Sequence, residues 1–286
     1  MGLGGYLTWT AAAREIVERI NVPDIKVMPM EQCANGIIKL IKSEIFENNP
    51  NIFQELEEDI FVFPIVLNNP QTNYCKEDTP VYAKHRFDKH IIEQICEVYG
   101  IPDPELRCEL YFTHEESEKV TNLLSDVGVK QGFVVIEPQS NEEYTVNKLY
   151  PLEKWQFVVD ELNKKGHQVV QVGRETEEFK LSNVVDLTGI TSFREAALVI
   201  SCAKLFISSE GGLMHAAHAV STRSVIVYTG FIHPDMTSYK ENSNIWIGKY
   251  HGPCGMKVRC NRCELDAKNH DPREILDEAV KTLETV

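Results

Sequence analysis

Short apolar runs alternate with helical stretches throughout the second half of the chain. The apolar runs, each of strand length and rich in Val, Ile or Leu, are residues 133–136, 168–173, 184–189, 205–207 and 225–228. Residues 152–164 and 193–202 instead carry apolar side chains at helical spacing. Strands that alternate with helices along a chain form parallel, doubly wound sheets. The pattern therefore predicts an α/β fold for this half.

The first half shows the same alternation less regularly. We expect strands at residues 25–28, 60–66 and 110–112, and helices at residues 7–20, 32–46, 89–99 and 113–128. The polar stretch 68–82 predicts either a plain surface loop or an acceptor-side loop. The basic stretch 84–90 predicts either a solvated helix entry or a contact for an anionic acceptor. A break near residues 129–132 predicts two domains, 1–131 and 132–286.

Glycines gather just before the first predicted helix. Gly2, Gly4 and Gly5 predict a loop, since glycine adopts backbone conformations that other residues avoid. A strand would ordinarily precede such a loop in an α/β unit, but no apolar run stands before Gly2. We therefore expect the first strand of this half to be missing.

The richest local pattern follows the apolar run 205–207. Glu210, Gly211 and Gly212 form a predicted turn, and small helix-compatible residues follow, including His215. Glycines let the backbone approach a ligand, and a helix start favours phosphate or sugar oxygens. Glu210 would then accept bonds from ribose or sugar hydroxyls, with His215 as a nearby donor. An ordinary turn, with Glu210 as a surface cap and His215 as a core histidine, fits these residues equally well.

Composition narrows the class of protein. With 286 residues, 43% hydrophobic and 25% charged, the chain is long enough for two globular domains. Its net charge of −14 argues against nucleic acid or an anionic membrane surface as the main partner. There is no apolar run of about 18 residues and no signal-peptide pattern, so we expect a cytoplasmic protein.

Three of the eight cysteines cluster near the C-terminus. His251, Cys254, Cys260 and Cys263 lie within thirteen residues, and their spacing fits a tetrahedral metal site. Zinc is the default ion, and sulfur-rich sites also take iron. Its role would be structural, fixing the segment before the last helix. Reduced thiols or a disulfide are the alternatives.

Residues 210–219 resemble a family hallmark, Asp-Ser-Gly-x-x-His-x-Ala-x-Ala. It is typical of glycosyltransferase family 9, the heptosyltransferases that use ADP-heptose. Glu210 stands at the Asp, Gly211 at the Ser, Gly212 at the Gly and His215 at the His. Pro138 with residues 148–155 is similar to the family's lysine-containing motif, and residues 186–195 are similar to the run before the hallmark. These matches follow one another in the family's order.

The resemblance implies a GT-B fold, in which two Rossmann-like, doubly wound parallel-sheet domains face a cleft. Residues 1–131 would form the acceptor side and 132–286 the nucleotide-sugar side. The donor would contact Gln139, Ser140, Lys148, Glu210, Gly211, Gly212 and His215. Transfer would invert the sugar and need no catalytic metal. The acceptor would be a cell-surface glycan, glycolipid or protein, as in lipopolysaccharide biosynthesis. Peripheral contact at the inner face of the membrane and assembly into an oligomer both stay open.

The N-terminal residues resemble the family's glycine-rich loop, with matches at Gly4 and Thr10. The family places a general base, Asp, where this chain has Gly5. The resemblance therefore leaves the catalytic residue unknown. Two other functions stay open, namely a GT-B protein that binds a sugar nucleotide or glycan without turning it over, and an isomerase of the UDP-sugar 2-epimerase type.

Overall fold

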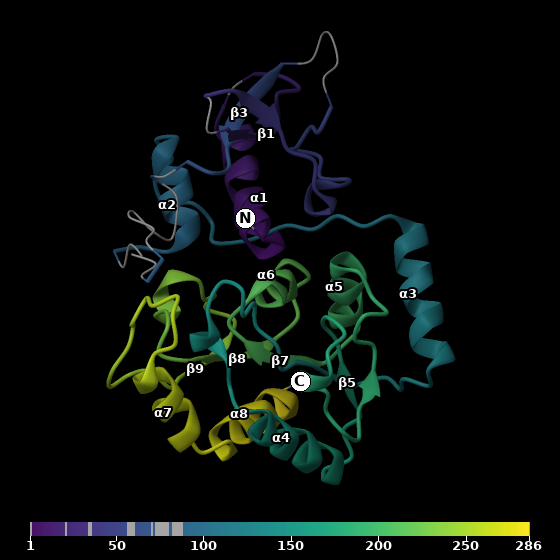
Figure 1. Ribbon diagram of the computed structural model, residues 1–286. Coiled ribbons are helices and arrows are strands. Elements are labelled where there is room, and N and C mark those ends of the chain that lie inside the picture. The colour runs from purple at the N-terminus through teal and green to yellow at the C-terminus, as the bar shows by residue number, and fades with distance from the viewer. Residues whose placement is uncertain are drawn as a thin grey trace.

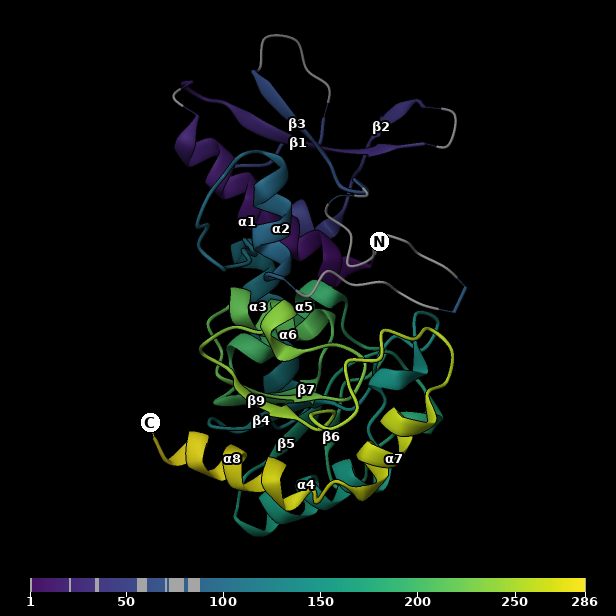
Figure 2. The ribbon, with the colours of Figure 1, turned by 90° about the vertical axis from the view of Figure 1, so that its left-hand side faces the viewer.

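The computed structural model describes residues 2–20, 22–33, 36–55, 61–69, 71, 80–81 and 88–285. Figures 1 and 2 show two parts, one above the other, with the N-terminus between them. From top to bottom the layers are a small sheet, two helices (α1 and α2), two further helices (α5 and α6), a larger sheet, and a layer with α4 and α8. Whether these parts are domains that divide at residue 131 stays a prediction.

The small sheet has three described strands in the order β2-β1-β3. β1 runs parallel to β3 and antiparallel to β2. The elements of this part are α1 (Leu3–Arg19), β1 (Lys26–Gln32), β2 (Ile38–Leu40), the 3-10 turn η1 (Glu44–Phe46), β3 (Val62–Val66) and α2 (Ile91–Val98). The predicted strands at 25–28 and 60–66 are confirmed over the residues that the structure describes. Most of loop 68–82 and of the basic stretch 84–90 lies outside the described residues.

Two predicted elements of the first half are wrong. Residues 32–46 do not form a helix, because the chain turns at Gly36, with a φ of 78°, and returns as β2, where Met30 pairs with Leu40. Residues 110–112 do not form a strand, because none of the described strands pairs with them. The carbonyl of Tyr111 instead accepts a bond of 2.6 Å from the Arg194 guanidinium.

The predicted glycine-rich loop is also wrong, since α1 already begins at Leu3. Gly4 and Gly5 lie in its first turn. The reason is a close packing of helices, because a Cβ on Gly4 would stand 2.5 Å from the Cα of Gly212, at the start of α6. Glycine is needed here for the approach of two backbones rather than for a loop conformation.

The large sheet confirms the parallel, doubly wound prediction. Its six strands follow the order β6-β5-β4-β7-β8-β9, and every described pair is parallel. The strands are β4 (Val134–Glu137), β5 (Val169–Gln171), β6 (Val185–Asp186), β7 (Leu205–Ser209), β8 (Ser224–Tyr228) and β9 (Ser243–Trp246). The helices are α4 (Leu152–Lys164), α5 (Phe193–Ser201), α6 (Gly212–Ala219), α7 (Asn261–Asn269) and α8 (Arg273–Glu284). α5 and α6 cover the face toward the upper part, and α4 and α8 cover the opposite face (Figure 1).

The upper and lower parts share one apolar core. Leu7 of α1 belongs to the same buried cluster as Leu213 and Met214 of α6. α3 (His114–Asp126) runs beside the lower part, and the buried Arg194 holds it there through a bond of 2.7 Å to Glu116. In the part of the chain that the structure describes, no helix combines the length and the apolarity that a membrane crossing requires.

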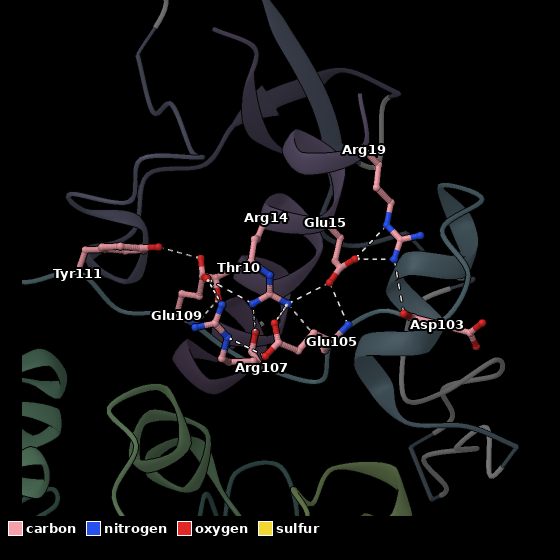
Figure 3. Close-up of polar contacts among 9 residues, drawn as sticks. All are labelled: Thr10, Arg14, Glu15, Arg19, Asp103, Glu105, Arg107, Glu109 and Tyr111. Carbon is pink, nitrogen blue, oxygen red and sulfur yellow. Dashed lines mark hydrogen bonds and ion pairs between the residues drawn. The ribbon is translucent and has the colours of Figure 1, made fainter. Parts of the chain in front are cut away.

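The segment between α2 and α3 is fastened to α1 by a buried ionic network (Figure 3). Arg14 contacts the Glu15 carboxylate at 3.1 Å and the Glu109 carboxylate at 3.3 Å, and it donates to the Arg107 carbonyl at 3.1 Å. The Thr10 hydroxyl accepts a bond of 2.8 Å from the Glu109 amide. This network holds the middle of α1, whose first turn carries Gly4 and Gly5.

Candidate functional site

A cavity of about 950 Å³ lies between the two parts. Its walls come from the start of α1, η1 and α2 on one side, and from the carboxyl ends of β4, β5 and β7 with the start of α6 on the other. Ligands of open α/β sheets bind at these strand ends. The sequence-predicted residues that line the cavity are Gly4, Gly5, Gln139, Ser140, Lys148, Glu210, Gly211, Gly212 and His215. Thr10 does not line it, because its side chain is engaged in the network under α1.

Lys148 and Glu210 form an ion pair at the edge of this cavity. Their side chains are 16% and 6% exposed, so the prediction of Glu210 as a surface cap is wrong. The Lys148 ammonium also lies 5.3 Å from the centre of the Phe231 ring and 5.8 Å from that of Tyr144. A cation held by a single carboxylate and by aromatic rings can also approach an anionic ligand in the cavity.

His215 is buried in α6 and contacts the cavity wall. Its Nδ1 lies 2.6 Å from the Tyr239 hydroxyl, which also contacts the Cys108 sulfur at 3.0 Å. Burial, followed by the nearby His90, lowers the pKa of His215 to about 3. The imidazole is therefore neutral at pH 7, and can serve as a hydrogen-bond partner but not as a fixed cation.

The end of β4 contributes three polar residues to the wall. The Gln139 side chain accepts a bond of 2.9 Å from the Arg174 amide, which ties β4 to the loop after β5. The Ser140 hydroxyl is buried without a hydrogen-bond partner among the described residues, as expected of a group that awaits a ligand. Burial, opposed by Arg174, raises the pKa of Glu137 to about 8, so that its neutral acid form is favoured at pH 7. Sequence analysis missed Glu137, although a carboxylate that directly follows a buried strand was a usable signal.

A second carboxylate that sequence analysis missed lies on the opposite wall. Among the described residues, Glu44 is the one ionisable group that the first half contributes to the lining. Burial, together with the neighbouring Glu47 carboxylate, raises the pKa of Glu44. Gly5 lies on the same wall and has no side chain to offer. Glu44 was hidden from sequence analysis because it fell inside the wrongly predicted helix at 32–46.

The clustered cysteines converge as predicted, but without the histidine. The sulfur atoms of Cys254, Cys260 and Cys263 lie within 4.8 Å of one another, and His251 is not part of this group. The Nδ1 of His251 lies 2.9 Å from the Asp266 carboxylate instead. A hydrogen bond from Cys263, at an S–S distance of 3.3 Å, lowers the pKa of Cys254 to about 6. Three convergent sulfurs with an accessible thiolate form a donor set that fits a soft metal ion.

Comparisons with known proteins agree with this geometry. The sequence profile of glycosyltransferase family 9 (heptosyltransferase) matches residues 80–264. Lipopolysaccharide heptosyltransferase 3 of Escherichia coli (strain K12) is 25% identical over 183 residues, which cover 60% of this chain and 52% of that protein. The chain thus spans about half the length of the curated relatives that it matches.

Solved structures share the fold. The family 9 glycosyl transferase of Veillonella parvula DSM 2008 superposes with a TM-score of 0.71 at 15% identity, covering 100% of this chain and 95% of that one. The iron-containing dodecameric glycosyltransferase TibC of enterotoxigenic E. coli H10407 gives 0.66 at 15% identity, with 100% and 74% covered. TibC has also been solved with ADP-D-β-D-heptose. These similarities confirm the GT-B fold, and the profile match extends over more than half of the sequence. The chain therefore belongs to glycosyltransferase family 9, the heptosyltransferase family.

Proposed function

We propose that this chain transfers a heptose-like sugar, with ADP-heptose favoured as donor, to a hydroxyl of a cell-surface glycan, glycolipid or protein. The observation that carries the proposal is the buried pair of Lys148 and Glu210, which lies where the strand ends and the start of α6 meet the cavity. An anionic sugar nucleotide needs such a cation beside free backbone N–H groups. Family membership supports transferase chemistry.

On the donor side, Lys148 and the first N–H groups of α6 would stabilise the negative charge of the departing diphosphate. This assignment gives the charge neutralisation to the protein itself and requires no catalytic metal. Glu210 would orient Lys148 and accept bonds from ribose or sugar hydroxyls. The buried Ser140 hydroxyl and the neutral His215 would complete the donor contacts, while Gln139 shapes the wall through Arg174.

On the acceptor side, Glu44 would act as the general base. The acceptor oxygen would attack the anomeric carbon from the face opposite the diphosphate, and its proton would pass to the Glu44 carboxylate. The bond from the anomeric carbon to the diphosphate oxygen would break, with its electron pair leaving on the nucleotide, so that the configuration inverts. Burial and the neighbouring Glu47 carboxylate raise the pKa of Glu44, and a carboxylate with a raised pKa is a stronger base.

A thermal-shift screen with ADP-, UDP-, GDP- and CMP-sugars tests the donor assignment. A ligand that binds only the folded state raises the melting temperature, and we expect the largest rise with ADP-heptose. Lys148→Ala should remove most of that rise, whereas Lys164→Ala, on the exposed face of α4, should leave it unchanged. If none of these sugar nucleotides shifts the melting temperature, the donor site is wrongly assigned.

Turnover separates the alternatives. Release of ADP that depends on an added glycan or glycolipid acceptor supports transfer. A thermal shift without release of the nucleotide would identify a binding protein instead. Gly5 favours that alternative, because it stands where the family has the Asp general base. Formation of a sugar epimer in the absence of acceptor would identify an isomerase and contradict the proposal.

We also propose a structural zinc or iron ion at the cysteine group. Cys254, Cys260 and Cys263 would hold it, and the ion would cross-link the chain before α7. TibC, with the same fold, contains iron and assembles as a dodecamer. By analogy with TibC, we propose that this chain also assembles as an oligomer. We further propose that it acts in the cytoplasm, at the inner face of the membrane. Metal analysis of the purified protein tests it, because Cys263→Ala should lose the ion, whereas His251→Ala should retain it.

A further inference from the structure

The cysteine group is connected to the donor lysine through one buried side chain, that of Asn147. The Asn147 amide nitrogen donates to the carbonyl of Met256 at 2.6 Å and to that of Val258 at 2.8 Å. Its amide oxygen accepts a bond of 2.7 Å from the backbone of Cys260. Asn147 is 5% exposed, and the partners lie more than 100 residues away in the chain. Both donors of this side chain and its carbonyl oxygen therefore bind the segment that carries the cysteines.

Neighbouring residues reinforce the same connection. Thr145 is fully buried. Its hydroxyl donates to the Met256 carbonyl at 2.9 Å and accepts a bond of 3.1 Å from the backbone N–H of Asn147. The Thr229 hydroxyl, at the end of β8, donates to the Asn147 carbonyl. These contacts fix the 3-10 turn Val146–Lys148 on both sides. The position of Lys148 is thus determined by residues 256–260 and by β8.

The cysteine segment itself has little regular structure to hold it. Residues 252–260 form no helix and no strand apart from a single bridge. One end is attached to β8 by the Cys254 amide, which donates to the Gly230 carbonyl at 2.7 Å, and Cys263 packs against Gly230. The contacts among the three sulfurs join the two ends. Separating these sulfurs would free the carbonyls of Met256 and Val258 that Asn147 requires.

We propose that Asn147 is a positioning residue that couples the cysteine group to the donor site, so that the state of the cysteines sets the affinity for the sugar nucleotide. The proposal rests on the donor role of Lys148 given above. Coupling between two sites is reciprocal, and typical values correspond to about 5- to 150-fold in affinity. Donor binding should therefore slow the modification of the cysteines, since intact cysteines favour donor binding.

Two measurements on the full chain test the coupling. Calorimetry with ADP-heptose should show about tenfold weaker binding after alkylation of the cysteine group, and a similar loss in Asn147→Ala without alkylation. Alkylation of Asn147→Ala should then cause little further loss, because the connection is already broken. Asn163→Ala is the matched control. Asn163 lies at the exposed end of α4, away from the cysteine group, and its side-chain amide donates to the Asn183 carbonyl.

The second measurement does not depend on donor binding. The rate at which Ellman's reagent modifies the cysteine group in Asn147→Ala should exceed that in Asn163→Ala several-fold. Thr145→Val, which keeps the size of the side chain but removes its bond to the Met256 carbonyl, should lie between them and serves if Asn147→Ala fails to fold. Equal thiol rates in all these variants, or unchanged donor affinity after alkylation, would overturn the coupling. Absence of donor binding in the parent protein, with the thiol rates as expected, would instead refute the proposed donor site, while the connection between Asn147 and the cysteine group would stand.

Discussion

Gly4 and Gly212 meet where the two parts of the molecule face each other, so closely that a Cβ on Gly4 would lie 2.5 Å from the Cα of Gly212. The first turn of α1 and the first turn of α6 are therefore in backbone contact. Gly212 also belongs to the proposed diphosphate site, which means that the packing of the two helices and the shape of the donor site depend on the same pair of glycines.

Replacement of Gly4 should disturb both. Gly4→Ala forces α1 away from α6, and overpacking of this kind costs about 1–3 kcal/mol of unfolding free energy. The displacement also widens the donor side of the cavity, so kcat/KM should fall. Urea unfolding and steady-state kinetics measure the two effects. Gly2→Ala is the control, because a Cβ there meets nothing within 4 Å.

Loss of the Lys148 charge should weaken donor binding more than loss of its partner's charge. Hydrogen bonds to charged groups contribute about 1.5–3 kcal/mol, which corresponds to roughly 10- to 100-fold in affinity for Lys148→Ala. Glu210→Gln keeps the size and a hydrogen-bond acceptor, so its loss should be smaller. Calorimetry with ADP-heptose gives both constants. A larger loss for Glu210→Gln would mean that Glu210, and not Lys148, provides the main donor contact.

The proposed base is tested by removing its charge without changing its size. Glu44→Gln should lower kcat by about 100-fold or more while the donor affinity stays within a factor of two, since general-base catalysis contributes about 10²–10⁴-fold. Glu44→Asp should recover part of the rate. Glu118→Gln is the control, because Glu118 is exposed on α3, does not line the cavity and is not among the groups that shift the pKa of Glu44. An unchanged kcat in Glu44→Gln would exclude Glu44 as the base.

Sequence analysis predicted the residues of the cavity wall in the lower part well, because the signals for this wall are local. The run 205–219 shows strand, turn and helix start within fifteen residues, and the structure places Glu210, Gly212 and His215 along one cavity wall. Helix α4 matches its predicted bounds because apolar spacing alone defines it.

The cavity wall in the upper part was harder to predict because its structure depends on distant contacts. Residues 32–46 have helical spacing, but antiparallel pairing with β1 overrides it, and this error hid Glu44. The spacing of His251 suggested a metal ligand, whereas Asp266, fifteen residues away, holds its ring. Local spacing cannot anticipate a competing partner from another element.

Stability should fall in acid partly because of His90. Burial lowers the pKa of this side chain to about 4, whereas the unfolded chain has the ordinary value of about 6.5. Between these values only the unfolded state binds the proton, so stability is lost as the pH falls, by about 1.4 kcal/mol per pH unit. His90→Asn keeps a cap for the Ile92 amide of α2 and should reduce that slope between pH 6 and 4. Urea unfolding at several pH values measures it, and an unchanged slope would contradict the assignment.

The ionic network under α1 should contribute more to stability than an exposed pair of the same chemistry. Arg14 is 4% exposed and faces Glu15 and Glu109, so Arg14→Met removes the buried cation that these two buried carboxylates share and should cost about 3–5 kcal/mol of unfolding free energy. Arg19→Met removes the half-exposed partner of Glu15 and should cost about 1 kcal/mol or less. Urea unfolding at pH 7 gives both values. Because the same network holds α1, whose first turn packs against α6, Arg14→Met should also raise KM for the donor. Equal costs for the two variants would show that burial adds nothing to the Arg14 contacts.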